Sequence, residues 1–406
     1  MNILFLMKVY EIGGQEVVTS VLAKSFSDNN NNVIIACFNQ PNKMMIRRTC
    51  DAVKVYSLNG FNYSENNVAK LRDILISEKI DIVINQWGLP YIGAKVLEKA
   101  KKGLKVKVIA IYHNDPGTNA RIKDVEIELS KTDNGFKRLL LIAKKNLYRF
   151  ITSRSMRYVY NHSDVYQVLS PSFVERFKNF TGIKNPKKLM VQTNPVTIET
   201  GDFVLKPANK EKEIIYVGRI DYNQKRVYRV IDTWALLEKK YPDWRLTIVG
   251  DGVERENIEK QAKALGLKNV SFEGFKSPIE YYKRARILML TSEYEGFPLV
   301  LAECMSFGVV PAVYGSYSAV YDIVNDGVNG IVFPYQKEGF SAEKAAIQLQ
   351  KIMHNDAVYN DMAEKAIETS KRYSVDEIYR SWEETFEKTE NVIFIKYKDE
   401  RYCSFS

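Results

Sequence analysis

Two carboxylates flank a predicted helix start in the segment Thr291–Glu303, TSEYEGFPLVLAE. It follows an apolar run that is typical of a buried strand. Pro298 is favoured at the first position of a helix, because its missing N–H would be unpaired there in any case. Glu295 is therefore expected on the preceding loop, and Glu303 more than one turn inside the helix. Both side chains could accept hydrogen bonds from hydroxyl groups.

The residues between these carboxylates favour an anion. Gly296 lets another molecule approach the backbone closely. The amides of Leu299 and Val300 would be free at the helix start, where a phosphate is stabilised. Phosphate-binding amides beside two hydroxyl-accepting carboxylates suit a sugar nucleotide.

A second group of candidates is cationic. Gly218 and Arg219 follow the predicted strand Glu213–Val217, and Lys225 precedes the predicted helix Val227–Leu237. A guanidinium can bind two diphosphate oxygens and an ammonium adds a point charge, so this loop could neutralise a diphosphate. A solvated loop is the alternative. The turn at Gly250, after the next strand, is a weaker candidate for bordering the nucleotide.

Near the N-terminus, Gly13 and Gly14 form a turn between a strand and an apolar helix, where a substrate could approach the helix start. The spacing is not the GxGxxG fingerprint of dinucleotide-binding proteins, and a plain turn fits equally well. His113 ends a predicted strand, which favours a position at a ligand-binding edge, although a lone histidine is usually structural. His162 and His354 are expected in helical, structural positions.

No metal or cofactor is expected. No His, Cys or carboxylate cluster has metal-ligand spacing, and no Asp-x-Asp pair could hold a divalent ion on a diphosphate. The four cysteines (Cys37, Cys50, Cys304 and Cys403) show no pairing pattern, which favours a reducing cytoplasm. The first residues are typical of a strand rather than a signal peptide, and no apolar run could span a bilayer.

The charge is uneven along the 406 residues. Residues 1–194 contain 30 Lys and Arg against 16 Asp and Glu, and residues 195–406 contain 29 against 33. Residues 136–163 contain no acidic residue and mix cations with apolar residues at helical spacing, as interfacial helices do. We therefore expect peripheral contact between the basic first half and an anionic membrane. An internal helix with a solvated basic face is the alternative, and no nucleic-acid motif accompanies the charge.

The alternation of apolar runs and helical segments predicts an α/β fold with two doubly wound parallel sheets. The predicted strands are Asn2–Met7, Val33–Phe38, Lys54–Leu58, Asp81–Gln86, Lys107–His113, Val165–Ser170, Glu213–Val217, Arg245–Val249, Val270–Phe272, Ile287–Leu290, Val309–Val313 and Gly330–Phe333. We expect domains at 1–194 and 195–373 facing an interdomain cleft, and a helix and tail, 374–406, that return toward the first domain. Ligands of such sheets bind beyond the carboxyl ends of the strands.

Taken together, these segments resemble retaining glycosyltransferase family 4, of bacterial surface-polysaccharide type and GT-B fold with two Rossmann-like domains. The matching features are Gly13-Gly14, His113, Val217-Gly218-Arg219 with Lys225, the segments 248–252, 265–267, 270–274 and 326–330, and the pair Glu295 and Glu303. Pro195 departs from the family's Asn-Gly-Val pattern. Within this resemblance, the first domain would bind the acceptor and the second the donor.

The resemblance also implies residue roles. Arg219 and Lys225 would bind the diphosphate, Glu303 the ribose and Glu295 the transferred sugar, while His113 would contact that sugar near its reacting carbon. The full set of implied donor contacts is Gly13, Gly14, Gly218, Arg219, Lys225, Gly250, Glu295, Gly296, Phe297, Leu299, Val300 and Glu303.

These features predict a cytoplasmic, metal-independent hexosyltransferase. It would move a sugar from a nucleotide sugar, UDP-linked by family resemblance, to a lipid-linked or surface-polysaccharide acceptor. Two alternatives stay open. One is a sugar-nucleotide epimerase of the same fold, which would isomerise its donor without an acceptor. The other is a non-catalytic sugar-nucleotide-binding subunit.

Overall fold

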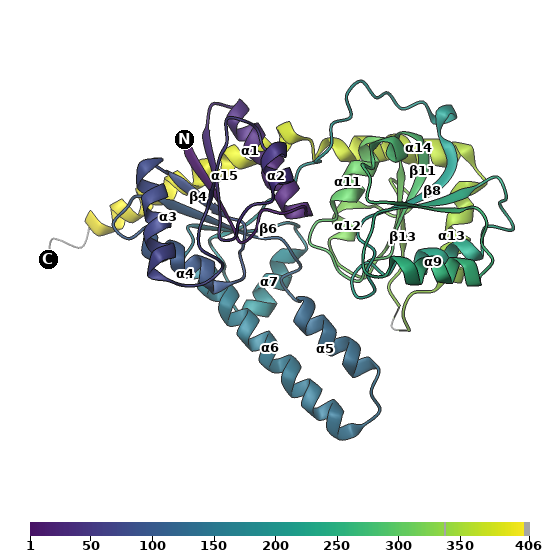
Figure 1. The fold of residues 1–406 in the computed structure, drawn as a ribbon, viewed down its shortest axis with the longest axis horizontal. Helices are drawn as coiled ribbons and strands as arrows, with labels where there is room; N and C mark the ends of the chain where they lie inside the picture. Colours follow the sequence, from purple (N-terminus) through teal and green to yellow (C-terminus); the bar gives the residue numbers. More distant parts are fainter. Residues whose placement is uncertain (337, 402–406) are drawn as a thin grey trace. The chain divides into compact units, whose positions relative to one another are not determined.

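A computed structural model describes residues 1–336 and 338–401, with side chains as far as residue 389. The chain forms two compact units, one of Met1–Pro195 with Val375–Ser406 and one of Val196–Ser374 (Figure 1). Of the predicted C-terminal tail, residues 402–406, including Cys403, lie outside the described residues.

The first unit is built on a seven-stranded parallel sheet in the order β3-β2-β1-β4-β5-β6-β7. Its strands are β1 (Asn2–Met7), β2 (Asn32–Cys37), β3 (Lys54–Ser57), β4 (Ile82–Asn85), β5 (Lys107–Tyr112), β6 (Val165–Val168) and β7 (Leu189–Val191). Its helices are α1 (Gly14–Asp28), α2 (Lys43–Arg48), α3 (Glu65–Ser77), α4 (Tyr91–Ala100), α5 (Ala120–Ser130), α6 (Gly135–Asn161), α7 (Phe173–Thr181) and α15 (Val375–Arg401).

The second unit has a six-stranded parallel sheet in the order β10-β9-β8-β11-β12-β13. Its strands are β8 (Glu211–Val217), β9 (Arg245–Val249), β10 (Val270–Gly274), β11 (Ala285–Leu290), β12 (Val310–Tyr314) and β13 (Ile331–Phe333). After the 3-10 turn Pro207–Asn209, the helices are α8 (Tyr228–Ala235), α9 (Arg255–Ala264), α10 (Ile279–Arg284), α11 (Leu299–Ser306), α12 (Val320–Ile323), α13 (Ala342–Met353) and α14 (Asp356–Lys371).

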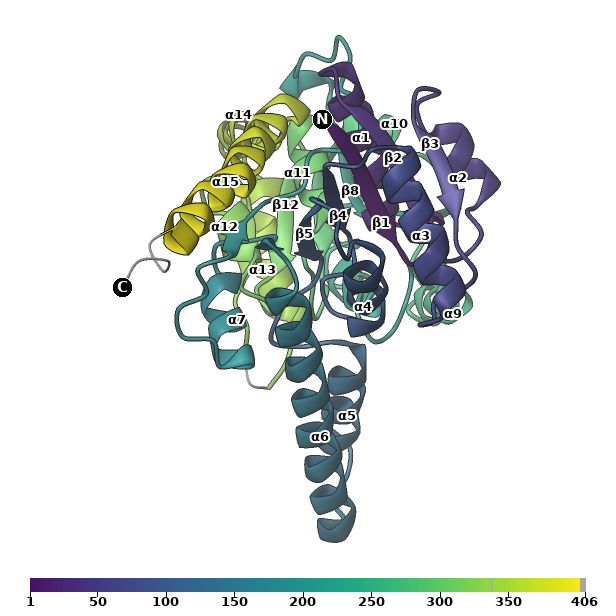
Figure 2. The same ribbon diagram turned by 90° about the vertical axis from the view of Figure 1, so that its left-hand side faces the viewer.

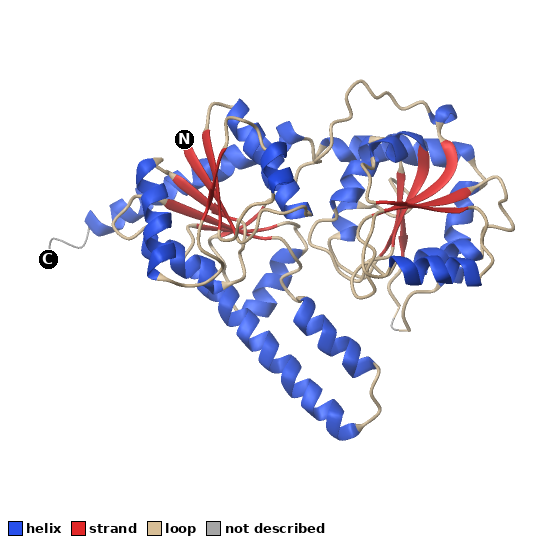
Figure 3. Cartoon of the chain, viewed as in Figure 1, coloured by secondary structure: helices blue, strands red, loops and turns tan. Residues whose placement is uncertain are grey.

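Helices flank each sheet, so the central strands are buried on both faces (Figure 3). In β1, residues 3–7 are at most 1 % exposed, and all six residues of β11 are buried. Such strands are near-continuous apolar runs rather than alternating ones, in β11 from Ile287 onward. Burying each large apolar side chain contributes about 1.5–3 kcal/mol, so these runs fix the sheet centres.

Helix α15 belongs to the first unit although it is last in sequence. The Phe26 ring on α1 lies 5.8 Å from the ring centre of Tyr379 and 5.5 Å from those of Trp382 and Phe386. Aromatic rings at these distances add edge-to-face attraction to the burial of apolar area. This aromatic cluster holds the C-terminal helix on α1.

In both sheets the strand order reverses at one point, between β1 and β4 in the first unit and between β8 and β11 in the second. Loops leave such a point in opposite directions and open a crevice beyond the strand ends, which is where doubly wound sheets bind ligands. The candidate residues should therefore lie on the loops after these strands.

The predicted α/β class and all twelve predicted strands are confirmed, with end shifts of one or two residues. The short strand β7 was missed because its three residues are only half-buried and give little apolar signal. Pro298 is a small correction. Its ψ of 91° is extended, so it caps α11 and Leu299 becomes the first helical residue.

Candidate active site

The loops after β8 and β11 bring three predicted residues together in the second unit. The Nζ atom of Lys225 lies 2.6 Å from Oε1 of Glu295, and both side chains are largely buried. Arg219 joins them through Gln224, which accepts a hydrogen bond from Nη2 of Arg219 at 3.0 Å and donates one to Oε2 of Glu295 at 3.2 Å. Two cations and one carboxylate therefore share one hydrogen-bonded cluster at the switch point.

Asp221 shapes the cationic loop. Its carboxylate accepts hydrogen bonds from Nε of Arg219 and from the backbone amides of Gln224 and Lys225. Burial works against the charged form, but the Gln224 amide, the Arg219 guanidinium and the Lys225 amide outweigh it and lower the pKa of Asp221 below its usual value. Asp221 is therefore ionised at neutral pH and fixes the loop that carries both cations.

Glycines allow the neighbouring strand ends to approach closely. Gly218 and Gly250 have φ values of 148° and 142°, and a Cβ atom on Gly250 would overlap the Gly218 carbonyl oxygen. Any other residue at position 250 would push apart the loops after β8 and β9. Gly250 thus supports the position of Arg219 by allowing this approach.

Glu303 has partners of its own. It is 6 % exposed, accepts a hydrogen bond from the Thr197 hydroxyl, and lies 3.4 Å from the Tyr282 hydroxyl. Both hydroxyls come from elements distant in sequence, so Glu303 is held from two sides.

Other predicted donor residues lie between the two carboxylates. Gly296 is buried, and the ring of Phe297 packs at 5.2 Å from that of Tyr373. A contact from Phe297 to a ligand would therefore use its backbone rather than its ring. Leu299 and Val300 open α11, where backbone amides are available to an anion.

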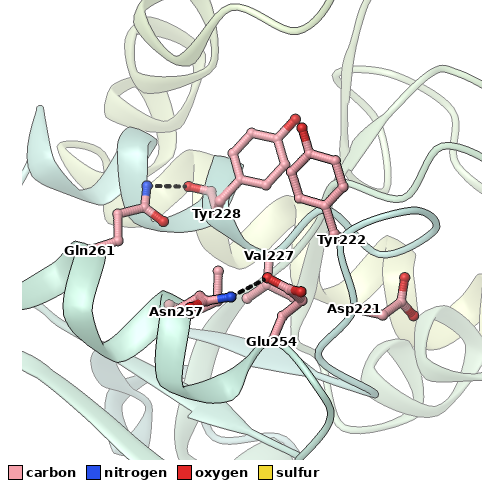
Figure 4. Close-up of a pocket in the computed structure, with 8 residues that line it drawn as sticks. Asp221, Tyr222, Val227, Tyr228, Glu254, Asn257 and Gln261 are labelled. Carbon is pink, nitrogen blue, oxygen red and sulfur yellow. Dashed lines mark hydrogen bonds between the residues drawn. The ribbon is translucent and has the colours of Figure 1, made fainter. Parts of the chain in front are cut away.

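A pocket adjoins this cluster in the second unit (Figure 4). Asp221, Tyr222, Val227 and Tyr228 line it from the β8–α8 loop and the start of α8. The other lining residues are Glu254, which precedes α9, and three residues on α9, namely Asn257, Ile258 and Gln261. The rings of Tyr222 and Tyr228 stack at 5.5 Å. Its lining has two carboxylates and no cation, so this pocket is unsuited to phosphate and is distinct from the cationic cluster.

In the first unit, Gln86 connects two predicted features. Its side-chain oxygen accepts a hydrogen bond from Nε2 of His113, and its backbone oxygen accepts one from the Gln15 side chain at 2.9 Å. Gln15 directly follows Gly13-Gly14, so the glycine turn and His113 lie at one site beside β4. The carboxylate of Glu16 occupies the space beside Gly13. Burial raises the pKa of this carboxyl group.

The histidine is held neutral. Burial lowers the pKa of His113 to about 3. Because the Gln86 oxygen can only accept, the proton of the neutral ring lies on Nε2 and the lone pair on Nδ1. Nearby, Asn85 Nδ2, Gln86 Nε2 and Trp87 Nε1 have no hydrogen-bond partner within the described side chains. The site offers several uncharged polar groups, which suits hydroxyl ligands better than ions.

This shift predicts a pH dependence of folding. The unfolded chain binds a proton at His113 below about pH 6.5, whereas the folded chain binds it only near pH 3. The unfolded state therefore holds more protons between these values, and stability falls as the pH falls through this window. The free energy of unfolding, measured with urea at several pH values, should fall less on acidification in His113→Asn than in the wild type. An equal fall in both proteins would contradict a neutral, partly buried imidazole at His113.

The other two histidines lie at helix ends. His162 and His354 cap the C-terminal ends of α6 and α13 and form hydrogen bonds with Tyr158 and Tyr241.

In the described part of the chain, no three His, Cys, Asp or Glu side chains are grouped so that they could hold a metal ion. The described helices include none that is long and apolar enough to cross a membrane.

The structure therefore groups the predicted residues into three places. Arg219, Lys225 and Glu295 form one cluster. Glu303, on α11, is bonded by Thr197 and Tyr282, and His113 lies with the Gly13-Gly14 turn in the first unit. Sequence reasoning missed Asp221, Gln224, Thr197, Tyr282, Gln15 and Gln86. Gln86 could have been found, because it ends a predicted strand in the same way as His113.

Comparisons with known proteins identify the families that the two halves of the chain match. Residues 12–200 match the family described as Glycosyltransferase Family 4, and residues 197–369 match Glycosyl transferases group 1. An uncharacterised glycosyltransferase of Haemophilus influenzae is 31 % identical over 51 % of this chain and 56 % of its own length. The matched segment thus spans little more than half of that relative.

Two further proteins are informative. An α-1,4-N-acetyl-D-galactosaminyltransferase of Campylobacter jejuni, named for an undecaprenol-linked glycan acceptor, is 24 % identical over 61 % of this chain and 68 % of its own length. The solved structure of Anabaena HepE in complex with UDP aligns with a TM-score of 0.72 at 17 % identity, covering 95 % of this chain and all of that one. Such low identity establishes the shared fold alone. With residues 12–369 matched by these two models and both sheets doubly wound, the chain belongs to glycosyltransferase family 4 and has the GT-B fold.

Proposed function

We propose that this protein is a retaining hexosyltransferase that uses a UDP-hexose donor and a lipid-linked or surface-polysaccharide acceptor. The observation that carries the proposal is the Lys225–Glu295 pair, joined to Arg219 at the switch point of the second sheet. UDP bound to HepE supports the nucleotide, and the Campylobacter relative supports a lipid-linked glycan acceptor.

The donor would exchange partners with this cluster. A diphosphate arriving at Arg219 and Lys225 takes the Lys225 ammonium as its counter-ion, because its charge density exceeds that of a carboxylate. Glu295 is thereby released to accept hydrogen bonds from hydroxyls of the sugar. Binding of the diphosphate therefore frees Glu295 for the sugar hydroxyls. A nucleotide sugar provides a partner for Lys225 and for Glu295.

Further roles follow from the chemistry of each position. Glu303, already held by hydroxyl donors, accepts hydrogen bonds from the ribose hydroxyls. The amides of Leu299 and Val300 bind a phosphate oxygen. The neutral imidazole of His113 contacts the sugar, and Gly14 borders the phosphates, as the family resemblance implies. An ionised Glu16 beside Gly13 would repel a phosphate at Gly14, and burial lessens that repulsion because it raises the pKa of the Glu16 carboxyl group.

The reaction breaks the bond between the anomeric carbon and the diphosphate oxygen. Negative charge grows on that oxygen, and preset cations and amides stabilise it more in the transition state than in the ground state. The acceptor hydroxyl forms its bond to the same face of the anomeric carbon, which retains configuration. Its proton passes to the departing phosphate oxygen. No protein nucleophile is needed.

Transfer of labelled sugar tests this function. The full chain, incubated with isolated bacterial membranes and each common UDP-hexose, should release UDP and label a lipid or glycan fraction. Arg219→Ala protein is the matched control. Conversion of the donor to an isomer without acceptor would instead indicate an epimerase. Tight donor binding without turnover in any membrane fraction would indicate a binding subunit.

A further inference from the structure

The helices α5 and α6 form a hairpin, residues 120–161, that projects from the rest of the first unit (Figures 1 and 2). The two helices pack on each other, and Ile122 and Val125 of α5 and Leu141 of α6 are buried. The N-terminal half of α6 is otherwise exposed. The hairpin is a separate projection with an outer face that the unit does not cover.

That outer face is apolar. Phe136, Leu139, Leu140, Leu147, Phe150 and Ile151 are each at least half exposed, and Phe136 is 73 % exposed. They stand at positions i, i+3, i+4, i+11, i+14 and i+15, with Ala143 at i+7, so they lie along one side of the helix. The stripe runs for about 22 Å along the axis, at 1.5 Å per residue. An exposed apolar stripe of this length marks an interaction surface.

Cations border this stripe. The helix carries Lys137, Arg138, Lys144, Lys145, Arg149, Arg154 and Arg157, and residues 136–163 contain no acid. Lys145 bridges to Glu126 of α5 at 3.7 Å, and among the described residues it is the one member of this set with an ion pair. At 3.6 residues per turn, Lys137, Lys144 and Arg157 flank the apolar stripe and Arg154 continues it, whereas Arg138, Lys145 and Arg149 lie on the other side of the helix, toward α5 and α7. Four of the seven cations therefore accompany the stripe, and none of these four has an ion pair among the described residues.

We propose that the α5–α6 hairpin lies on an anionic membrane surface, with its apolar stripe among the acyl chains and its cations on the lipid phosphates. Apolar burial and charge neutralisation would act together there, as at interfacial amphipathic helices. The choice of partner follows from charge. A second copy of the chain would bring two positive faces together without an acid on α6 to pair them, and nucleic acid would leave the apolar stripe in water.

Vesicle sedimentation tests the proposal without any need for transferase activity. The full chain should sediment with vesicles of phosphatidylcholine containing phosphatidylglycerol, and at least tenfold less with phosphatidylcholine alone. The triple variant Phe136→Ser, Leu140→Ser and Leu147→Ser should bind the anionic vesicles at least tenfold more weakly. These side chains are exposed, so the fold should survive, which circular dichroism and urea unfolding would check.

Two further variants separate the causes. Lys137→Gln, Lys144→Gln and Arg154→Gln together should remove the preference for anionic lipid and its sensitivity to salt. The control Met44→Ser, Ile76→Ser and Ile347→Ser removes three exposed apolar side chains elsewhere and should bind as the wild type does. Unchanged sedimentation of both hairpin variants would overturn the proposal. So would self-association in light scattering that the serine variant abolishes while vesicle binding persists.

Discussion

Replacing Lys225 by alanine is expected to lower kcat by about 10²- to 10³-fold, and Arg219→Ala should do the same. Each change removes one preset positive group from the position where the leaving diphosphate gains charge, and loss of one such group costs enzymes about that much. The effect should fall on kcat more than on KM, because the charge is greatest in the transition state. Steady-state release of UDP from a UDP-hexose measures both constants.

Two controls separate catalysis from folding. Lys212, on β8 of the same unit, forms an exposed ion pair with Asp243, so Lys212→Ala should leave turnover unchanged. Lys225→Ala also leaves Glu295 buried without its counter-ion, which costs stability on the order of 3 kcal/mol. The double variant Lys225→Ala, Glu295→Gln should recover stability but not turnover. Near-normal turnover in Lys225→Ala would remove this lysine from the diphosphate site.

Glu303→Gln and Glu295→Gln are expected to weaken binding of different ligands. If Glu303 holds the ribose, its change should weaken binding of UDP itself by about 10- to 100-fold, the range for a hydrogen bond to a charged group. If Glu295 holds the sugar, its change should leave UDP binding nearly intact and weaken UDP-hexose binding. Calorimetric titration with both ligands distinguishes the roles, and equal losses in both variants would refute them.

A variant of Thr197, which holds Glu303 in place, tests the same assignment. Among the described residues, the Thr197 hydroxyl donates a hydrogen bond to Glu303 and makes none to Lys225 or Glu295. Thr197→Val should therefore resemble a mild form of Glu303→Gln. An effect of Thr197→Val on the sugar alone would place Glu303 at the wrong end of the donor.

The positions of the charged candidates could be predicted from sequence because they follow buried apolar runs. The run Ile287–Leu290 is all inside β11, and Glu295 follows on its exit loop as expected. Gly218 and Arg219 follow β8 in the same way. Parallel sheets place their strand ends at a common edge, so strand assignment alone positions these residues.

The partners of these residues could not be predicted in the same way. Thr197 is 106 residues from Glu303, and Lys225 is 70 residues from Glu295, so their pairing depends on sheet order rather than on local pattern. Gln224 is an ordinary polar loop residue until the fold places it between a cation and a carboxylate. Helical periodicity likewise indicates an apolar stripe on residues 136–151, but not that this stripe lies on a projecting hairpin.

Equilibrium binding of UDP to the full chain tests the central claim most directly. We predict that the wild-type protein binds UDP and that the double variant Arg219→Ala, Lys225→Ala binds it at least a hundredfold more weakly, while Lys212→Ala binds it normally. A wild-type protein that binds no nucleotide diphosphate, or a double variant that binds UDP as tightly as the wild type, would contradict a donor site at the ends of β8 and β11.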